Sequence, residues 1–289
     1  MNYHDEIEKF LKKYTYRQIK VGKAVFRYVI AGDESKPCVV FLNGGMNCSE
    51  MWFKYVEKMS VPYRTLIFDY PQEFKTCDET AEAIMLFLKQ LGISKAFFAG
   101  ASFGGLMAQI IARKHPEIVT GLGLFSTAGL DKRTISNSKK KYMLLPVLVW
   151  YMKHCNYEKL KGKVTDRSLK SYAKDETPQD TLYLRQMFEY MFKDYTREKD
   201  IHITSMMAGL KKLPPCERKH FTSFGNKVLL IFPEKDFFST DEQASLKYLF
   251  PKAKVEYIKN GHFGTVLECD KYIGLMNEII NEQPLCLEI

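Results

Sequence analysis

The chain has 289 residues, of which 46% are hydrophobic and 27% are charged, and its net charge is +9 at pH 7. This length suits one large α/β domain, or a domain that carries a sizeable insertion, and the composition excludes a disordered chain, a fibrous repeat and a small disulfide-stapled protein. The longest apolar run, 143–152, has ten residues and is too short to span a bilayer.

The first half of the chain alternates predicted strands and helices. A charged helix over about 3–14 leads into the first two strands, 16–21 and 24–31. Apolar runs typical of strands buried on both faces of a parallel sheet follow at 38–42, 65–68 and 95–99, and 119–125 is predicted as another strand. Helical spacing occurs over 80–91 and 103–114. The alternation predicts a parallel sheet with helices on both faces.

The alternation stops at Leu130, and the pattern is helical only from there to about Phe224. Strands return at 227–232 and 255–258, on either side of a helix at 241–249. We therefore predict a core domain, 1–130 and 221–289, and a helical cap inserted over 131–220.

One helix of this insertion has a wide apolar face. Met187, Phe188 and Met191 recur at helical spacing, and Thr177-Pro178 supplies an N-cap with proline in the first turn. The face either packs against the body of the protein or covers a pocket for an apolar substrate.

The positive charge is concentrated in the insertion. Residues 131–220 hold 20 Lys and Arg against 11 Asp and Glu, and the rest of the chain holds 23 of each kind. The simplest interpretation is a solvated, lysine-rich surface, and the alternative is weak contact with anionic lipid or an acidic ligand. No nucleic-acid-binding motif accompanies the lysines, so we expect no nucleic-acid partner.

The cysteines and the first residues favour a cytoplasmic location. Seven cysteines are scattered without a C-x-x-C pair, which predicts free thiols and no zinc site. The stretch 1–14 is charged throughout and shows no apolar segment of a secretory signal.

The most informative motif is Gly100-Ala101-Ser102-Phe103-Gly104, a G-x-S-x-G pattern between an apolar strand and a helix. A serine at such a sharp turn needs a strained backbone, and glycines two residues before and after avoid a clash. The turn would expose the Ser102 hydroxyl and aim the Phe103 amide outward as half of an oxyanion hole. Ser102 is the predicted nucleophile.

A serine nucleophile needs a base and an orienting carboxylate. The chain order Ser, acid, His selects Asp236, which follows the strand at 227–232, and His262, which follows the strand at 255–258. Both lie just past the carboxyl ends of strands, where open parallel sheets place their sites. Glu234 and Asp131 are the alternative acids.

The second oxyanion donor is expected in the loop Asn43-Gly44-Gly45-Met46, directly after the buried strand 38–42. We choose the Gly45 amide, with Met46 as the alternative. The side chains predicted to bind substrate are Met46, Met187, Phe188 and Met191.

With these motifs, the chain resembles the α/β-hydrolase superfamily, and within it the group that carries a helical cap between the sixth and seventh strands. The resemblance extends from about Tyr16 to Ile280. It implies the α/β-hydrolase fold, with an eight-stranded, mostly parallel sheet flanked by helices, a serine nucleophile and no cofactor. Haloalkane dehalogenases and epoxide hydrolases of the superfamily use Asp at the nucleophile position, which disfavours those two reactions here.

The chain departs from its relatives in three segments. Asn43-Gly44 stands where they commonly have His-Gly, Pro233-Glu234-Lys235-Asp236 replaces Gly-Glu-x-Asp, and 69–73 replaces a glycine-rich turn. The loop at Asn43 also lacks the His-Gly-Gly-Pro-Gly run of the aminopeptidase-like branch, which makes peptide hydrolysis less favoured.

The sequence thus predicts a serine hydrolase that cleaves a small-molecule carboxylic ester or thioester with an apolar acyl or aromatic group, without a metal or cofactor. An acyltransferase, a peptidase-like enzyme and a ligand receptor with little turnover are the alternatives. The natural substrate, the pathway and the oligomeric state are left open by the sequence.

Overall fold

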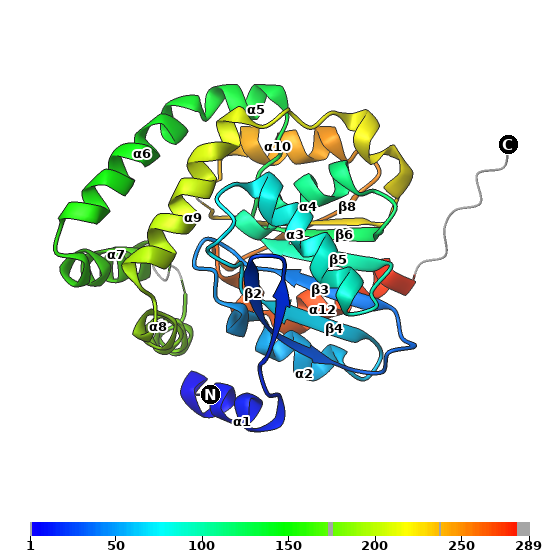
Figure 1. The fold of residues 1–289 in the computed structure, drawn as a ribbon, viewed down its shortest axis with the longest axis horizontal. Helices are drawn as coiled ribbons and strands as arrows, with labels where there is room; N and C mark the ends of the chain where they lie inside the picture. The colour runs from blue at the N-terminus through cyan, green and yellow to red at the C-terminus, as the bar shows by residue number, and fades with distance from the viewer. Residues whose placement is uncertain (1, 173–175, 237, 282–289) are drawn as a thin grey trace, which may run out of the picture.

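The computed structural model describes residues 2–172, 176–236 and 238–281, which form an eight-stranded sheet surrounded by helices (Figure 1). The strand order is β1-β2-β4-β3-β5-β6-β7-β8. The strands are β1 (Arg17–Val21), β2 (Ala24–Ala31), β3 (Cys38–Leu42), β4 (Arg64–Phe68), β5 (Ala96–Ala101), β6 (Val119–Phe125), β7 (Val228–Pro233) and β8 (Lys254–Ile258). β2 pairs antiparallel with β1 and β4, and all other pairs are parallel. The predicted fold class is confirmed.

The central strands are buried along their whole length. Every residue of β3, β4, β5 and β7 is buried, which explains why these strands are mostly apolar rather than alternating. Two hydrophobic clusters cover the two faces of the sheet. One cluster includes α3 (Cys77–Gln90), α4 (Phe103–Lys114) and α10 (Thr240–Leu249), and the other includes α1 (Tyr3–Lys13), α2 (Phe53–Met59) and α12 (Cys269–Asn281).

The remaining short helices connect these elements. Ser49–Trp52 forms the 3₁₀ turn η1 before α2, and α11 (Gly264–Leu267) precedes α12. Neither α2 nor η1 was predicted from the sequence.

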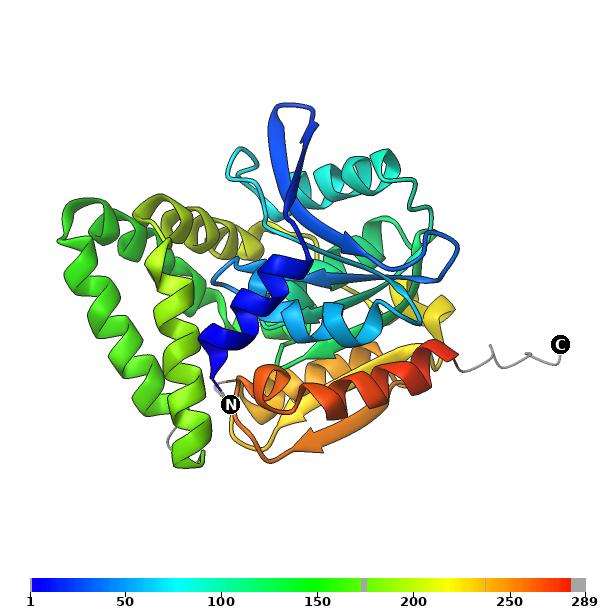
Figure 2. The same ribbon diagram turned by 90° about the horizontal axis from the view of Figure 1, so that it is seen from below.

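A group of helices lies between β6 and β7, and no strand occurs in its described part, as predicted. It consists of α5 (Lys132–Asn137), α6 (Lys139–His154), α7 (Tyr157–Tyr172), α8 (Pro178–Lys193), α9 (Arg197–Gly209), η2 (Leu210–Lys212) and η3 (Arg218–Phe224). Figures 1 and 2 show α6, α7 and α8 together at one side of the molecule, away from the sheet. None of the helices in the described ranges is long and apolar enough to cross a membrane.

The N-terminal helix is tied to this insertion. The Tyr3 amide donates a hydrogen bond of 3.0 Å to Oε1 of Gln186 on α8, and the Tyr183 hydroxyl donates to the Glu6 carboxylate.

Thr177 caps α8 by accepting from the Asp180 amide, and Pro178 occupies the first helical position. The predicted start of this helix is confirmed.

Candidate active site

Ser102 occupies a strained turn between β5 and α4. Its φ of 55° and ψ of −119° lie outside the regions that residues with a side chain favour. The Ser102 amide donates to the Phe125 carbonyl at 2.9 Å, and the Thr127 hydroxyl donates to the Ser102 carbonyl at 2.7 Å. The neighbouring strand β6 and the residues after it therefore hold the turn in place.

The two glycines of the motif are required by packing. A Cβ at Gly100 would collide with the backbone of Gly104, and a Cβ at Gly104 would collide with the carbonyl of Leu42. Both positions therefore accept only glycine without a backbone shift, as the motif predicts.

His262 and Asp236 meet at the carboxyl ends of β7 and β8. Nδ1 of His262 lies 2.8 Å from Oδ1 of Asp236, and the two side chains are only 9% and 1% exposed. With Nδ1 donating to the carboxylate, a neutral imidazole carries its lone pair on Nε2. This is the tautomer that a general base requires.

Of the two alternative acids, Asp131 is engaged elsewhere and Glu234 is exposed. Asp131 caps α5 by accepting from the Thr134 amide at 2.7 Å, and it also accepts from the Ser245 hydroxyl. Glu234 is exposed, and its amide donates to the Ile258 carbonyl at 2.8 Å. The structure therefore places Asp236, and neither alternative, against the His262 ring.

Ser102 and His262 line one cavity of about 300 Å³. Among the described residues, the Ser102 hydroxyl is not hydrogen-bonded to the imidazole. Catalytic hydrogen bonds are often long in enzymes without ligand and become shorter when substrate binds. The cavity brings the two groups to the same space, in which a substrate would contact both.

The walls of the cavity are mostly apolar. All four side chains predicted to bind substrate line it, namely Met46, Met187, Phe188 and Met191. Further lining residues that the sequence analysis missed include Met51, Val164, Phe192 and Met207. The periodicity of α8 was the signal for three of the predicted residues, whereas α7 and α9 offered no comparable pattern.

The loop after β3 lies against the same cavity. Gly45 lines it, and a Cβ at this position would meet no atom within 4 Å. The loop is held by Asn47, whose φ is 44° and whose side chain bonds to both backbone groups of Tyr70, at 2.7 and 2.9 Å. The Phe103 amide begins α4, where the first backbone N–H groups have no partner within the helix.

Asn43 occupies the position at which relatives commonly have histidine. Its side chain is fully buried, and Nδ2 donates to the Phe68 carbonyl at 2.7 Å. The Tyr70 hydroxyl donates to the Asn43 carbonyl at 3.1 Å. Asn43 thus fastens the start of the loop to the strand β4.

Two polar residues of the insertion face the cavity. Tyr195 and Asp200 line it, and the Tyr195 hydroxyl donates to the Gly45 carbonyl at 3.4 Å. Burial raises the pKa of the Asp200 carboxyl above its ordinary value, although the Tyr157 hydroxyl donates to it at 3.1 Å. A polar corner therefore interrupts the apolar wall.

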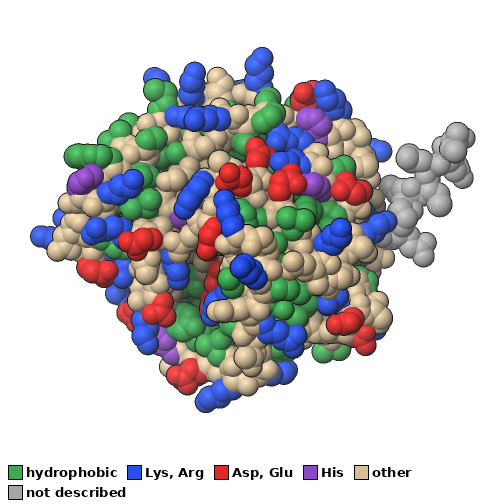
Figure 3. Space-filling view, in the orientation of Figure 1, with side chains coloured by type: hydrophobic (Ala, Val, Ile, Leu, Met, Phe, Trp, Pro, Cys, Tyr) green, Lys and Arg blue, Asp and Glu red, His purple; other side chains and the backbone are tan. Residues whose placement is uncertain are grey.

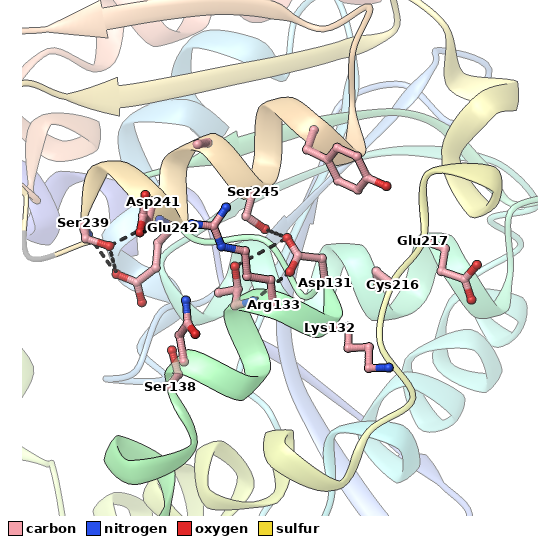
Figure 4. A pocket seen from close by; sticks show the side chains of 14 residues that line it. Asp131, Lys132, Arg133, Ser138, Cys216, Glu217, Ser239, Asp241, Glu242 and Ser245 are labelled. Atoms are coloured by element: carbon pink, nitrogen blue, oxygen red, sulfur yellow. Dashed lines mark hydrogen bonds and ion pairs between the residues drawn. The ribbon is translucent and has the colours of Figure 1, made fainter.

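A larger cavity, of about 710 Å³, lies around Asp131 between α5 and α10 (Figure 4). Its rim mixes both charges, and Arg133 lies 3.6 Å from Asp241. Neither Ser102, Asp236 nor His262 lines it. In the described ranges, no three His, Cys, Asp or Glu side chains are grouped as a metal site would require.

Comparison with known proteins matches this architecture. A sequence model described as the alpha/beta hydrolase fold matches residues 37–268. Mouse epoxide hydrolase 4 is 29% identical over 122 residues, which cover 39% of this chain and 34% of that protein. The match thus spans about a third of this curated relative's length.

Two solved structures superpose on nearly the whole chain, although their sequences are only 15% and 16% identical to it. A hydrolase from Pseudomonas aeruginosa PA01 superposes with a TM-score of 0.74 at 15% identity, covering 93% of this chain and 99% of that one. The enol-lactonase from Burkholderia xenovorans LB400 gives 0.73 at 16% identity, covering 92% and 100%. At this identity the likeness is one of fold.

Proposed function

The chain belongs to the alpha/beta hydrolase fold family, and on that premise we propose that it is a serine hydrolase. Its substrate is a carboxylic ester or thioester with an apolar acyl or aromatic group, and the reaction passes through an acyl-enzyme. The observation that carries this proposal is the strained Ser102 in the same cavity as His262, whose Nδ1 is held by the buried Asp236.

In the first half of the reaction, Nε2 of His262 takes the proton of the Ser102 hydroxyl as its oxygen attacks the ester carbonyl carbon. The buried Asp236 stabilises the imidazolium that forms. His262 then returns the proton to the leaving alcohol or thiol, and the acyl group stays on Ser102. Water then attacks the acyl group with His262 again taking up the proton, and the carboxylic acid is released from Ser102.

The charge on the tetrahedral intermediate is stabilised by two backbone amides. Phe103 supplies one at the start of α4, and Gly45 supplies the other from the loop after β3. Each such donor contributes about 3 kcal/mol to the stabilisation of the transition state. The anchoring of the loop by Asn43 and Asn47 keeps the second donor in place.

Serine favours acyl transfer over epoxide opening for a chemical reason. Attack of a Ser102 alkoxide on an epoxide would leave an ether on the enzyme, which water does not hydrolyse under these conditions. A carboxylate nucleophile instead leaves an ester, which can turn over. The similarity to an epoxide hydrolase in part of the chain therefore does not extend to this chemistry.

The cavity suits a compact apolar group. Its volume of about 300 Å³ lies at the lower end of the range for small-molecule pockets, and its methionines adapt to different shapes. Asp200 and Tyr195 provide the few polar contacts that would orient a substrate.

We place the enzyme in the cytoplasm, since the cysteines at 38, 48, 77, 155, 216 and 269 are free thiols.

Labelling with a fluorophosphonate tests the proposal. The native protein should become labelled at Ser102, and Ser102→Ala should not, because only an activated hydroxyl reacts with the probe. Absence of label on the native protein would favour a ligand receptor with the same fold.

A series of p-nitrophenyl esters of rising chain length then measures the preference for the acyl group. The same assay, run with and without alcohol acceptors, separates a hydrolase from an acyltransferase.

A further inference from the structure

The helix α6 is apolar on two opposite faces. The inner face packs on α9, with Met152 buried and Tyr142 against the hydrophobic core. The outer face has no covering element among the described residues, and its large side chains are between 41% and 67% exposed. These side chains are Met143, Leu144, Val147, Leu148, Trp150 and Tyr151.

These six residues form one continuous strip. At 100° per residue they occupy an arc of roughly 160° around the helix. Figures 1 and 2 both show α6 at the outer edge of the molecule. Contiguous apolar surface of this kind marks a site of contact with a protein or a membrane rather than ordinary solvated surface.

The charge around the strip is strongly positive. α6 contains four lysines and no acidic residue, and α7 contains five basic residues and two acidic ones. Lys139 and Lys140 are exposed at the start of α6, and Lys153 is exposed near its end. Figure 3 shows lysine and arginine side chains beside hydrophobic ones on this side of the molecule.

The helix α7, which follows α6, reaches the cavity. Val164 on α7 is 46% exposed, and it also lines the cavity that holds Ser102. Val164 therefore belongs both to the exposed surface of α7 and to the wall of the cavity.

We propose that the outer face of α6, as defined by the six residues above, docks on the surface of an anionic lipid bilayer. The apolar side chains insert at the boundary between headgroups and acyl chains, where Trp and Tyr are favoured, and the lysines contact anionic headgroups. The docked orientation delivers an apolar ester from the lipid past Val164. This delivery rests on the proposed function, whereas the docking does not.

A second copy of the chain is a poorer partner for this face. In a two-fold contact the same patch meets itself, so the lysines of both copies would approach one another. Like charges at such a contact oppose association. An anionic bilayer complements both the charge and the apolar strip.

Tryptophan fluorescence tests the docking directly. The chain has two tryptophans, of which Trp52 is fully buried and Trp150 is 62% exposed. The full chain is titrated with phosphatidylcholine vesicles that contain phosphatidylglycerol, with or without brominated acyl chains. Emission should shift to shorter wavelength and be quenched by the brominated lipid, and Trp150→Phe should remove both responses.

Matched variants separate the two contributions. Val147→Glu places a charge in the strip and should abolish the response, whereas Val61→Glu, at an 80% exposed position outside the insertion, should leave it unchanged. Replacing Lys139, Lys140 and Lys153 by Gln should weaken vesicle binding on the order of a hundredfold. High salt and vesicles of phosphatidylcholine alone should weaken it similarly.

Three results would overturn the proposal: an unshifted Trp150 emission with anionic vesicles, equal binding by Val147→Glu and Val61→Glu, or a lipid-independent dimer that buries Trp150 in sedimentation equilibrium. The fluorophosphonate labelling of Ser102 in solution reports on the proposed function separately. Failed docking with retained labelling would therefore reject the membrane surface and leave the hydrolase intact.

Discussion

The carboxylate of Glu176 accepts a hydrogen bond of 2.9 Å from the amide of Gly261. Its second oxygen accepts from Nδ2 of Asn260 at 2.6 Å. Glu176 lies just before α8 in the insertion, and Gly261 precedes His262. The insertion therefore contacts the loop that carries the proposed base, and it does more than cover the cavity.

The first prediction concerns this contact. Glu176→Gln replaces one of the two accepting oxygens by an amide that donates, so one of the two bonds is lost and His262 is less well positioned. We expect kcat/KM for a p-nitrophenyl ester to fall about tenfold, the equivalent of one charged hydrogen bond. The fluorophosphonate labelling rate should fall in parallel, because the same His262 activates Ser102 toward the probe.

Glu189→Gln is the matched control, because Glu189 also belongs to the α8 region but its side chain is 57% exposed. This variant should keep the native rate. Equal rates for both variants would show that Glu176 does not position the His262 loop.

The second prediction separates the acid of the site from its alternative. Asp236→Asn preserves the shape of the side chain but favours the wrong tautomer of His262, and we expect kcat to fall on the order of 10⁴-fold. Asp131→Asn should leave kcat nearly unchanged and lower the free energy of unfolding by about 1–2 kcal/mol, because it removes the charged oxygen that accepts the buried bond from Ser245, while the amide oxygen can still cap α5. Steady-state kinetics and urea denaturation of both variants measure the two effects. The reverse pattern would assign the acid to Asp131.

The third prediction concerns the turn at Ser102. Gly104→Ala forces a Cβ against the Leu42 carbonyl, and we expect a loss of about 2–3 kcal/mol in the free energy of unfolding. Gly45→Ala has open space around its Cβ and should retain native stability. Urea denaturation compares the two, and similar midpoints would mean that the turn relaxes to admit a side chain at Gly104.

The fourth prediction is a pH dependence of stability that arises from His202. This side chain is 6% exposed, Nε2 donates to the Phe74 carbonyl at 2.7 Å, and Nδ1 has no partner among the described residues. Burial lowers the pKa of His202 below its ordinary value of 6.5. The unfolded chain thus binds this proton more readily than the folded one.

Stability should therefore fall as the pH drops below about 6.5 and the unfolded state takes up the proton. His202→Gln keeps a donor for the Phe74 carbonyl and cannot be protonated in this range, so its stability should vary less with pH. Urea midpoints between pH 5 and 8 compare the two proteins. Parallel curves would assign the pH dependence to other groups.

Much of the fold could be predicted because its signals are local. The central strands β3 and β5 are continuously apolar, and the cap Thr177 with Pro178 indicates where α8 begins. The short helix α2 was not predicted, since it begins directly after a 3₁₀ turn without a capping side chain. Burial on both faces and helix capping act within a few residues of the chain, so they leave a readable pattern.

The candidate site was likewise predictable from the sequence only in part. The turn around Ser102 depends on glycines two residues away, and the chain order narrowed the acid to three carboxylates. The sequence alone determined that a serine would stand at a strand-to-helix turn, because the strain and its relief lie within the same five residues.

Only the tertiary structure placed Asp236 against His262, joined Glu176 to Gly261 and turned an apolar face of α6 outward. These relationships link segments that are 26 and 85 positions apart, or depend on which face of a helix its neighbours cover. Contacts of that kind are set by how the helices and strands pack together, and packing is a property of the whole folded chain.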